Sequence, residues 1–356
     1  MQYIKIGKRV IGKDKEPLIV SEIGINHNGS LDLAIKIADS AINAGAEIIK
    51  HQTHVVDDEM ANISKSIVPG NSNRSIYDII KSCALSEKQE KKLMQHIKSR
   101  GSIFFSTPFS RKAVDRLEKF KVPLYKIGSG ECNNYPLIEY ICKKKKPIIL
   151  STGMNSIQTI KPAVRIIRKY KLPFALLHCT NIYPTPHKLV RLNAMLELKE
   201  SFKDAIVGLS DHSETIFPCL GAISMGASIV EKHYVHSKTI KGPDISSSMD
   251  KNELKDLIKA SKIIFEAKGG SKKPLKEESK TIAFAFASVA ALKDIKRGEK
   301  FTGSNIFPIR PGNGYFKVKD FSKLLKCSAN KDIRKGEQIK RSDVKENSQL
   351  KFSNVT

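Results

Sequence analysis

Eight short runs rich in β-forming residues precede residue 240, and each ends in polar residues and leads into a stretch of helical periodicity. They are PLIVSEIG (17–24), EIIKHQT (47–53), SIFFSTP (102–108), LYKIGSGE (124–131), PIILSTG (147–153), FALLHCT (174–180), AIVGLSD (205–211) and SIVEKHY (228–234). The number of runs constrains the fold most strongly, because strands that alternate with helices form parallel sheets and eight such units can close on themselves.

The segments between these runs carry apolar residues every three or four positions, as residues 31–44 and 86–100 illustrate. This spacing predicts amphipathic crossover helices. Near-continuous apolar strands are typical of a parallel sheet that is covered on both faces. We therefore predict a (β/α)8 TIM barrel. The alternative, an open doubly wound sheet, requires a glycine-rich phosphate turn after its first strand, and EIGINHNG at 22–29 lacks the GxGxxG pattern.

A change in composition marks the end of the barrel. The sequence AKGGSKKPLKEESK, which ends at Lys280, is rich in Gly, Lys and Glu and is typical of a linker. We predict a barrel domain at 1–265, a linker at 266–283 and a second domain at 284–356.

The second domain contains an internal repeat. LKDIKRGEKFTGSNI (292–306) recurs as NKDIRKGEQIKRSDV (330–344), and the two segments share KDI followed by Gly-Glu. Two copies are too few for a solenoid, which needs at least about three repeats. We therefore predict a small, compact β-rich domain.

The charge balance first points toward nucleic acid. The chain has 62 Lys and Arg against 36 Asp and Glu, a formal net charge of +26, and clustered basic residues bind phosphates. The basic residues are instead scattered along the chain, with the densest run at 143–146, and Trp is absent. We predict a solvated basic surface that steers an anionic substrate, and no nucleic-acid partner.

Location and redox state follow from what the sequence lacks. No stretch approaches the roughly 18 consecutive apolar residues of a membrane span, and the first 16 residues lack the apolar core of a secretory signal. We expect a soluble cytoplasmic protein without a membrane partner. The six Cys lie far apart without a CxxC pair, so we expect reduced, buried thiols.

In a barrel, the polar residues at the strand ends converge on one cavity. His212 and His233 follow neighbouring strands and could share a divalent metal, and neutral imidazole suits Mn, Fe, Co or Zn better than Ca. A hydrogen-bonded structural role is the alternative for each His alone. Their position on adjacent strand ends favours the metal pair.

Two lysines, Lys50 and Lys126, lie inside predicted strands where helices block the outer wall. Together with Thr107, Ser129 and Ser210 they provide the cations and hydroxyls that suit a phosphate and a carboxylate. A lysine whose head reaches solvent is the simpler alternative. A Schiff-base lysine, as in class I aldolases, is another alternative. That mechanism uses no metal, so the pair of histidines disfavours it.

The carboxylates best placed for proton transfer or for binding sugar hydroxyls are Glu22 and Glu131. Glu131 follows Ser129 in GSGECNN, whose glycines let the backbone approach a ligand closely. A surface salt bridge is the alternative for either Glu.

A series of motifs resembles, in order and spacing, the bacterial sialic acid synthase family. The motifs are SEIGINHNGS, IIKHQTH, FFSTPFS, YKIGSGECNNYPL, ILSTGMNS, LHCTNIYPTP, GLSDHS and KGPDISSSMD. FPIRPGNGYF, within the KDI-GE repeat, is similar to the antifreeze-like (SAF) domain of that family. The resemblance covers roughly residues 15–345.

The resemblance implies N-acetylneuraminate synthase activity, in which phosphoenolpyruvate, N-acetylmannosamine and water give N-acetylneuraminate and phosphate with a divalent metal, typically Mn²⁺. His212 and His233 then correspond to the metal ligands. The residues that correspond to the phosphoenolpyruvate site are Lys50, Thr107, Lys126, Ser129, Asn181 and Ser210. Those that correspond to positions around the sugar and the metal are Glu22, Gln52, Asn71, Glu131, Tyr183 and Asp244.

The resemblance also implies a domain-swapped homodimer, because Arg310 in the RPGNG turn corresponds to a residue that enters the partner's site. Three features depart from the family pattern or qualify it. Lys232 stands where the family often has Arg, His236 offers a competing ligand, and KHQTH at 50–54 resembles the branch that uses unphosphorylated N-acetylmannosamine. Synthases of legionaminic or pseudaminic acid share most motifs and are the alternative, and a basic binding protein is the alternative outside enzymes.

Overall fold

The computed structural model describes residues 3–69 and 73–345. Its contacts divide the chain into two units, residues 1–269 and 270–356. The first unit contains a barrel-like sheet, whose strands are β3 (Leu18–Gly24), β4 (Ile48–Thr53), β5 (Ile103–Pro108), β6 (Tyr125–Ile127), β7 (Ile148–Ser151), β8 (Phe174–Cys179), β9 (Ile206–Asp211) and β10 (Ile229–His233). Each lies within one of the eight runs that the sequence marks as strands.

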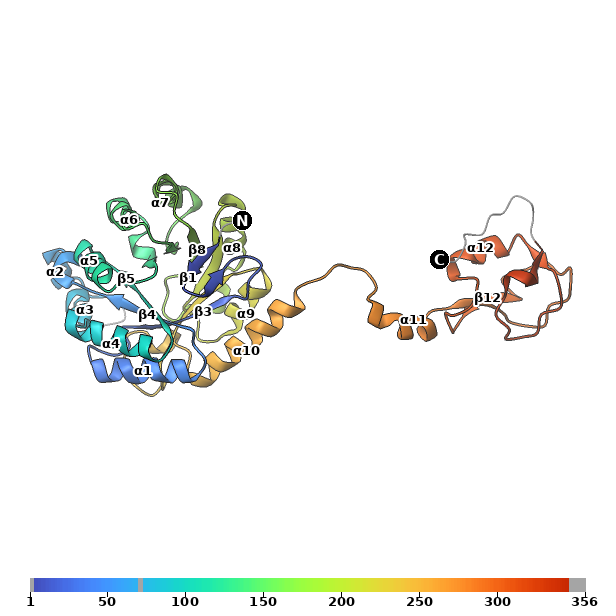
Figure 1. Cartoon of the computed structure of the whole chain (residues 1–356), viewed down its shortest axis with the longest axis horizontal. Helices are drawn as coiled ribbons and strands as arrows, with labels where there is room; N and C mark the ends of the chain where they lie inside the picture. The colour runs from blue at the N-terminus through green and yellow to red at the C-terminus, as the bar shows by residue number, and fades with distance from the viewer. Residues whose placement is uncertain (1–2, 70–72, 346–356) are drawn as a thin grey trace. The chain divides into compact units, whose positions relative to one another are not determined.

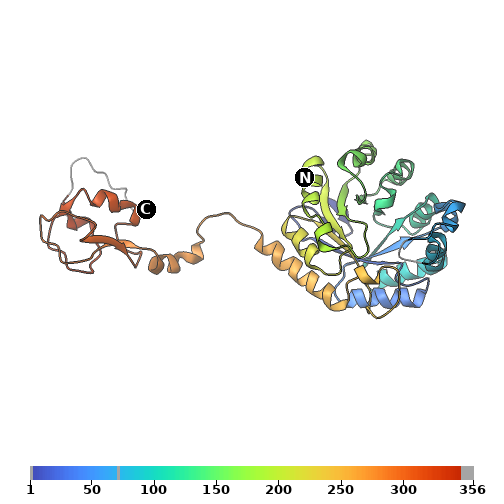
Figure 2. The same cartoon turned by 180° about the vertical axis from the view of Figure 1, so that it is seen from behind.

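These strands form one parallel sheet in the order β5-β4-β3-β10-β9-β8-β7-β6. The two end strands, β5 and β6, contact each other, so the sheet curves round into a barrel. The helices lie outside the strands, as Figures 1 and 2 show. The prediction of an eight-unit barrel is confirmed.

Helices α1 and α4 to α10 follow the strands in turn, and short helices α2 and α3 lie between β4 and α4. Their bounds are α1 (Leu31–Asn43), α2 (Val56–Glu59), α3 (Ile76–Cys83), α4 (Glu87–Ser99), α5 (Arg111–Lys119), α6 (Tyr135–Cys142), α7 (Ile157–Lys169), α8 (Asn193–Ser201), α9 (Phe217–Ser224) and α10 (Lys251–Ala267). Side-chain N-caps begin most of the longer ones. At α4, for example, Ser86 and Gln89 form a capping box.

The barrel has two apolar layers because strand side chains alternate between its faces. The larger layer packs between the strands and the helices. The smaller layer fills the barrel interior below the strand ends and is completed by an antiparallel hairpin that the sequence did not predict, β1 (Ile4–Ile6) with β2 (Arg9–Ile11). The interior is therefore a packed floor, and polar side chains occupy only the upper end.

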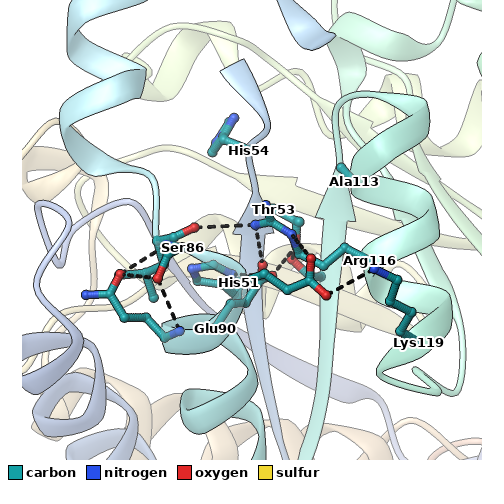
Figure 3. Close-up of polar contacts among 12 residues, drawn as sticks. His51, Thr53, His54, Ser86, Glu90, Ala113, Arg116 and Lys119 are labelled. Carbon is teal, nitrogen blue, oxygen red and sulfur yellow. Dashed lines mark hydrogen bonds and ion pairs between the residues drawn. The ribbon is translucent and has the colours of Figure 1, made fainter. Parts of the chain in front are cut away.

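A buried polar network lies outside the barrel, between β4, β5 and helices α4 and α5 (Figure 3). Glu90 of α4 is fully buried. Its carboxylate accepts hydrogen bonds from His51, 3.2 Å away, and from Thr53, and its second oxygen lies 3.1 Å from Arg116 Nη1. Burial raises the pKa of Glu90, but His51, Thr53 and Arg116 outweigh this effect and lower it overall. The network joins the outer face of β4 to two helices.

We predict that Arg116→Met lowers the free energy of unfolding by about 3–5 kcal/mol, because it leaves the buried Glu90 carboxylate without its cation. Urea denaturation followed by circular dichroism measures the change. The matched control is Arg168→Met, which removes an exposed ion pair with Asp204 and should cost at most about 1 kcal/mol. Equal losses in the two variants would contradict the prediction.

The second unit is a small domain of short strands and helices. Its elements are α11 (Ser279–Ala285), β11 (Ser288–Ala291), β12 (Ile306–Ile309), α12 (Phe321–Leu324), β13 (Ser328–Ala329) and β14 (Val344–Lys345). Strands β11 and β12 pair antiparallel, as do β13 and β14. Helix α11 begins inside the predicted linker, and its Ala283 carbonyl accepts a hydrogen bond from Gly312 N, 2.8 Å away. The end of that linker is therefore part of the second unit.

The internal repeat is built as a pair of matching segments. Ile295 and Ile333, at equivalent positions of the two copies, exchange backbone hydrogen bonds of 2.9 Å in both directions. Asp294 accepts a hydrogen bond from the backbone N of Lys335 at 2.8 Å. The equivalent Asp332 accepts one from the backbone N of Arg297, also at 2.8 Å. The repeated KDI-GE sequence thus encodes two halves that pair with each other.

All six Cys lie among the described residues; they are buried and form no disulfide, as the sequence predicts. Within residues 3–69 and 73–345, no helix combines the length and the apolar content needed to cross a bilayer.

Candidate active site

Most of the predicted site residues line one cavity of about 220 Å³ at the carboxyl ends of the barrel strands. These residues are Glu22, Lys50, Gln52, Thr107, Lys126, Ser129, Asn181, Tyr183, Ser210, His212, His233 and Asp244. They come from β3 to β10 and the loops that follow, so residues more than 200 positions apart meet because the barrel closes.

Lys50 is the centre of the charge network in this cavity. Its Nζ is ion-paired with Glu22, lies 3.5 Å from Glu231 Oε1 and donates to Thr107 Oγ1 at 3.2 Å. Burial alone lowers the pKa of Lys50, but the carboxylates of Glu22 and Glu231 outweigh it and raise the pKa overall. Lys50 is therefore a permanent buried cation.

Lys126 is the second buried cation, and its surroundings are less acidic. Its Nζ lies 3.2 Å from Glu231 Oε1. Burial lowers the pKa of Lys126, and the attraction of Glu231 offsets this only in part. A bound dianion would stabilise the protonated form of Lys126. It would contact the ammonium groups of Lys50 and Lys126 together with Glu231.

From the sequence, Glu231 was expected among the strand-end residues that meet at the cavity, but no role was assigned to it. Its carboxylate bridges Lys50 and Lys126 and accepts from Ser210 Oγ at 3.2 Å. The signal was present, because Glu231 lies two residues before His233 in β10 and side chains of a strand share a face at every second position.

Several buried polar atoms at the cavity have no hydrogen-bond partner within the described part of the chain. They are Ser151 Oγ, Glu231 Oε2 and His233 Nδ1. Buried polar atoms are normally satisfied, so a concentration of unsatisfied ones in one cavity indicates a site whose ligand supplies the missing bonds.

Ser129 and Asn181 approach each other around Gly153. Gly153 N donates to Ser129 Oγ at 3.0 Å. A Cβ on Gly153 would lie 1.8 Å from Asn181 Oδ1, so only glycine fits here. This close approach places a hydroxyl and an amide side by side on the cavity wall.

His212 and His233 meet as predicted, with ring centroids 5.3 Å apart. His212 Nδ1 lies 3.0 Å from the Thr180 carbonyl, which can only accept, so Nδ1 carries a proton. Burial lowers the pKa of His212, but Cys179, whose Sγ lies 3.7 Å from Nδ1, raises it overall. The nitrogen that can face a metal ion is therefore Nε2.

His233 provides a nitrogen without a partner. Burial, together with the nearby charge of His212, holds the pKa of His233 well below its usual value. Its Nδ1 lies 3.7 Å from Asp244 Oδ2, and burial raises the pKa of Asp244 to about 6. Two imidazoles with one orphaned nitrogen fit two positions of a divalent metal shell. Within the described residues, no set of three or more His, Cys, Asp or Glu side chains is arranged to hold a metal.

Lys232 lies on the outer face of β10 and links this strand to the end of β9, just before His212. Its Nζ donates to Asp211 Oδ2 at 2.6 Å and to the Ser213 carbonyl at 2.5 Å, and these residues flank His212. Lys232 is 1% exposed, so this pair is dry. The ammonium group of Lys232, the residue before His233, thus contacts the residues on either side of His212.

Glu131 does not line the cavity, contrary to our expectation. The strand ends at Ile127, earlier than predicted, and residues Ser129–Glu131 form a 3₁₀ turn. Ser129 and Gly130 line the cavity, whereas Glu131 is not among its lining residues. The Glu131 carboxylate accepts from the Asn134 amide at 2.6 Å, and burial raises its pKa.

Three other expectations have different outcomes. His236 does not line the cavity, so it is no competing ligand there. Arg310 lies in the second unit, where it is exposed and precedes a cis peptide bond to Pro311. Asn71 lies outside the described residues.

The two histidines of KHQTH take different places. His51 points to the outer face of β4, where it contacts His27 and Glu90. It therefore cannot touch a substrate. His54 lies behind the cavity wall against Phe109 and Gln52.

The fold and the site together define a class. A (β/α)8 barrel whose strand ends carry two buried ammonium groups, several hydroxyls and an imidazole pair is an enzyme built around an anionic substrate.

Comparison with known proteins identifies the family. The NeuB family matches residues 12–273 and the SAF domain matches residues 286–345. The chain belongs to the NeuB family and carries a C-terminal SAF domain, so the predicted resemblance is confirmed. It is an enzyme of this synthase family.

The names of the relatives refer to different sugar acids. The chain is 36% identical to the N,N'-diacetyllegionaminic acid synthase of Campylobacter jejuni, over 92% of this chain and 99% of that protein. It is 34% identical to a pseudaminic acid synthase of Campylobacter jejuni, over 93% and 98%. The crystal structure of N-acetylneuraminic acid synthetase from Leptospira borgpetersenii in complex with citrate matches with a TM-score of 0.73 and 31% identity, over 79% of this chain and 95% of that one.

We predict that Lys126→Met weakens the binding of inorganic phosphate by about tenfold or more. A hydrogen bond to a charged group contributes about 1.5–3 kcal/mol, and 1.4 kcal/mol corresponds to about tenfold. Isothermal titration calorimetry measures the affinity. Lys144→Met, which removes a lysine paired with Asp115 outside the cavity, is the control and should bind like the unmodified chain. An unchanged affinity in Lys126→Met would remove this lysine from the anion site.

Proposed function

We propose that the enzyme is an N-acetylneuraminate synthase, which condenses phosphoenolpyruvate with open-chain N-acetylmannosamine and water to give N-acetylneuraminate and phosphate. The observation that carries the proposal is the pair of buried lysines, Lys50 and Lys126, at the strand ends of a NeuB-family barrel. The named relatives support legionaminic and pseudaminic acid synthases equally well, and these remain the alternative.

The lysine pair suits phosphoenolpyruvate because that substrate carries a phosphate and a carboxylate a few bonds apart. Lys50 and Lys126 share Glu231 as a counter-ion, and Lys50 also pairs with Glu22, so these carboxylates hold two cations at one place before a ligand arrives. Hydroxyls of Thr107, Ser129 and Ser210 line the same wall. Holding both anionic groups orients C3 toward the sugar and turns a two-substrate encounter into an oriented one.

The reaction forms a carbon–carbon bond and, from water, a carbon–oxygen bond at C2, and it breaks the bond between C2 and the phosphate oxygen. C3 of phosphoenolpyruvate attacks the aldehyde carbon, whose oxygen takes up a proton, and water adds at C2 before phosphate leaves. Of the carboxylates that line the cavity, we assign Glu22 the role of accepting the proton of this water. It is held by Lys50 and by Gln52, whose amide donates to Glu22 Oε1 at 3.0 Å. Because Glu131 does not line the cavity, we move the proton-transfer role from Glu131 to Glu22.

The imidazole pair would hold a divalent metal, which we propose is Mn²⁺. When bound, the ion supplies Lewis-acid polarisation of the sugar aldehyde. His212 and His233 contribute the nitrogens, and Asp244, 3.7 Å from His233, lies close enough to contact the ion or the sugar. The Tyr183 ring lies tilted against His212, with centroids 4.1 Å apart, and limits the space above the pair.

The acceptor sugar is proposed to be unphosphorylated. Among the described residues that line the cavity, Lys50 and Lys126 are the cations, and phosphoenolpyruvate occupies both. A sugar phosphate would find no further lysine or arginine on that wall. The contribution of Arg310 and Asn71 to the sugar site, the domain-swapped homodimer and the cytoplasmic location stay predictions.

The test is phosphate release from phosphoenolpyruvate across a panel of acetamido sugars. We expect kcat/KM with N-acetylmannosamine to exceed that with its 6-phosphate and with 2,4-diacetamido sugars by about tenfold, a difference of about 1.4 kcal/mol in transition-state binding. Preference for a diacetamido sugar would assign the alternative product. No phosphate release with any sugar would refute the synthase assignment.

A Schiff-base lyase is the second candidate, because the lowered pKa of Lys126 is what such a lysine needs. Borohydride with pyruvate separates the two. A lyase is trapped covalently and inactivated, whereas we expect this enzyme to stay active and unmodified by mass spectrometry.

We predict that the chain binds Mn²⁺ through His212 and His233 and that chelation abolishes turnover. Electron paramagnetic resonance of added Mn²⁺ should show binding by the unmodified chain and little or none by His212→Ala, which loses one of two protein nitrogens. His236→Ala is the matched control and should bind normally, since His236 does not line the cavity. Full turnover by chelated, metal-free protein would contradict the metal assignment.

A further inference from the structure

His54 is a buried histidine directly behind the cavity wall. It is 5% exposed and follows β4. Its ring stacks on Phe109 at 4.5 Å with an interplanar angle of 10°, and Phe109 lines the cavity. Its Nδ1 lies 2.9 and 3.1 Å from the two oxygens of Glu59, and its Nε2 lies 3.2 Å from Gln52 Oε1. Both ring nitrogens therefore have a close polar neighbour.

The orientation of the Gln52 amide is fixed by its other neighbour. Glu22 is ion-paired with Lys50, so its carboxylate only accepts hydrogen bonds. Gln52 must then present its NH₂ group to Glu22 Oε1, 3.0 Å away. The amide oxygen is left facing His54, and this oxygen accepts and cannot donate.

The same reasoning applies on the other side of the ring. The carboxylate of Glu59, whose side chain is 9% exposed, accepts at both oxygens. A neutral imidazole carries one N–H. If that proton is on Nδ1, the Nε2 lone pair faces the Gln52 oxygen; if it is on Nε2, the Nδ1 lone pair faces Glu59. Either neutral tautomer brings two acceptors together, and only the imidazolium donates to both.

We propose that His54 is a buried imidazolium that sets the polarity of Gln52, so that the cavity presents an N–H donor at this point to an oxygen of the acceptor sugar. The NH₂ group has two hydrogens, and one is used by Glu22. The other is available to the cavity that Gln52 lines. His54 is thus a positioning residue that acts through Gln52, and its effect on sugar binding rests on the proposed function.

The surroundings favour a cation at this place. The ring lies flat on the face of Phe109, an arrangement that stabilises positive charge. Glu59, from α2, is the charged group that contacts it. Glu131 adds a second carboxylate nearby: after burial and the opposing hydrogen bond from Asn134, the charge of Glu59 also raises the pKa of Glu131. The residue that we first expected in the cavity therefore belongs to the acidic surroundings of His54.

The direct test is nitrogen-15 spectroscopy of histidine-labelled protein at pH 7. The chain has nine His, and the resonances of residue 54 are those missing in His54→Gln. We expect both ring nitrogens to have the shifts of protonated nitrogen. A neutral pattern, with one protonated and one unprotonated nitrogen, would overturn the proposal whatever the enzyme's activity.

Kinetics test the effect on the sugar. His54→Gln should raise KM for the sugar by about tenfold and leave KM for phosphoenolpyruvate within about twofold, because a charge-assisted hydrogen bond to Gln52 is lost while the lysines are untouched. His54→Arg, a cation that can stack on Phe109, should restore much of the sugar KM. Equal changes in both KM values, or an arginine variant no better than glutamine, would overturn the positioning role.

His51→Gln is the matched control, since His51 is also buried and also contacts a glutamate but lies within β4, on its outer face. It should lower thermal stability without changing the ratio of the two KM values. If the protein has no synthase activity with any sugar, the proposed function fails, and the nitrogen-15 measurement still decides the charge of His54.

Discussion

Two ammonium groups and two carboxylates share a dry space at the end of the barrel, and most of the site is arranged around keeping them paired. Lys50 contacts Glu22 and Glu231, and Lys126 contacts Glu231. Isolated buried charges are costly, so such groups persist only with partners in good geometry. Glu231 keeps one oxygen unpartnered within the described chain. The pairing holds the lysines in place before a ligand arrives, and the free oxygen and shared counter-ion leave the cations able to take an anion.

The alternation of side chains along β4 and β10 lets each strand serve two purposes. On the inside, β4 carries Lys50, while its outer His51 is fixed to Glu90 of α4. In β10, His233 points to the inside. Its neighbour Lys232 is on the outer face, where it is buried against Asp211 of β9. Polar networks outside the barrel therefore fix the backbone that presents the reactive side chains inside it. Because these networks are dry, small displacements break hydrogen bonds that cannot be replaced by water.

The sequence was sufficient to predict the eight-strand barrel, since each strand is an apolar run bounded by polar residues and helical periodicity. It also placed most cavity residues correctly, because strand ends meet in this fold. It did not predict the 3₁₀ turn at Ser129–Glu131 after β6, because short turns leave no periodic signal. It did not separate His51 from His54, although the alternation of side chains along β4 places His51 on the face opposite to Lys50. The β1–β2 hairpin is a local element that the sequence analysis did not consider, whereas the Lys232–Asp211 pair is a tertiary contact that no local pattern encodes.

These features give a consistent account of a NeuB-family enzyme: a packed barrel floor, an anion site above it and an imidazole pair beside that site. The most direct measurement is a crystal structure of the enzyme with phosphoenolpyruvate alone. The account predicts its phosphate and carboxylate within hydrogen-bond distance of Lys50 Nζ and Lys126 Nζ, with Glu231 still between the two lysines. Phosphoenolpyruvate bound away from both lysines, or a covalent bond between either lysine and the ligand, would contradict it.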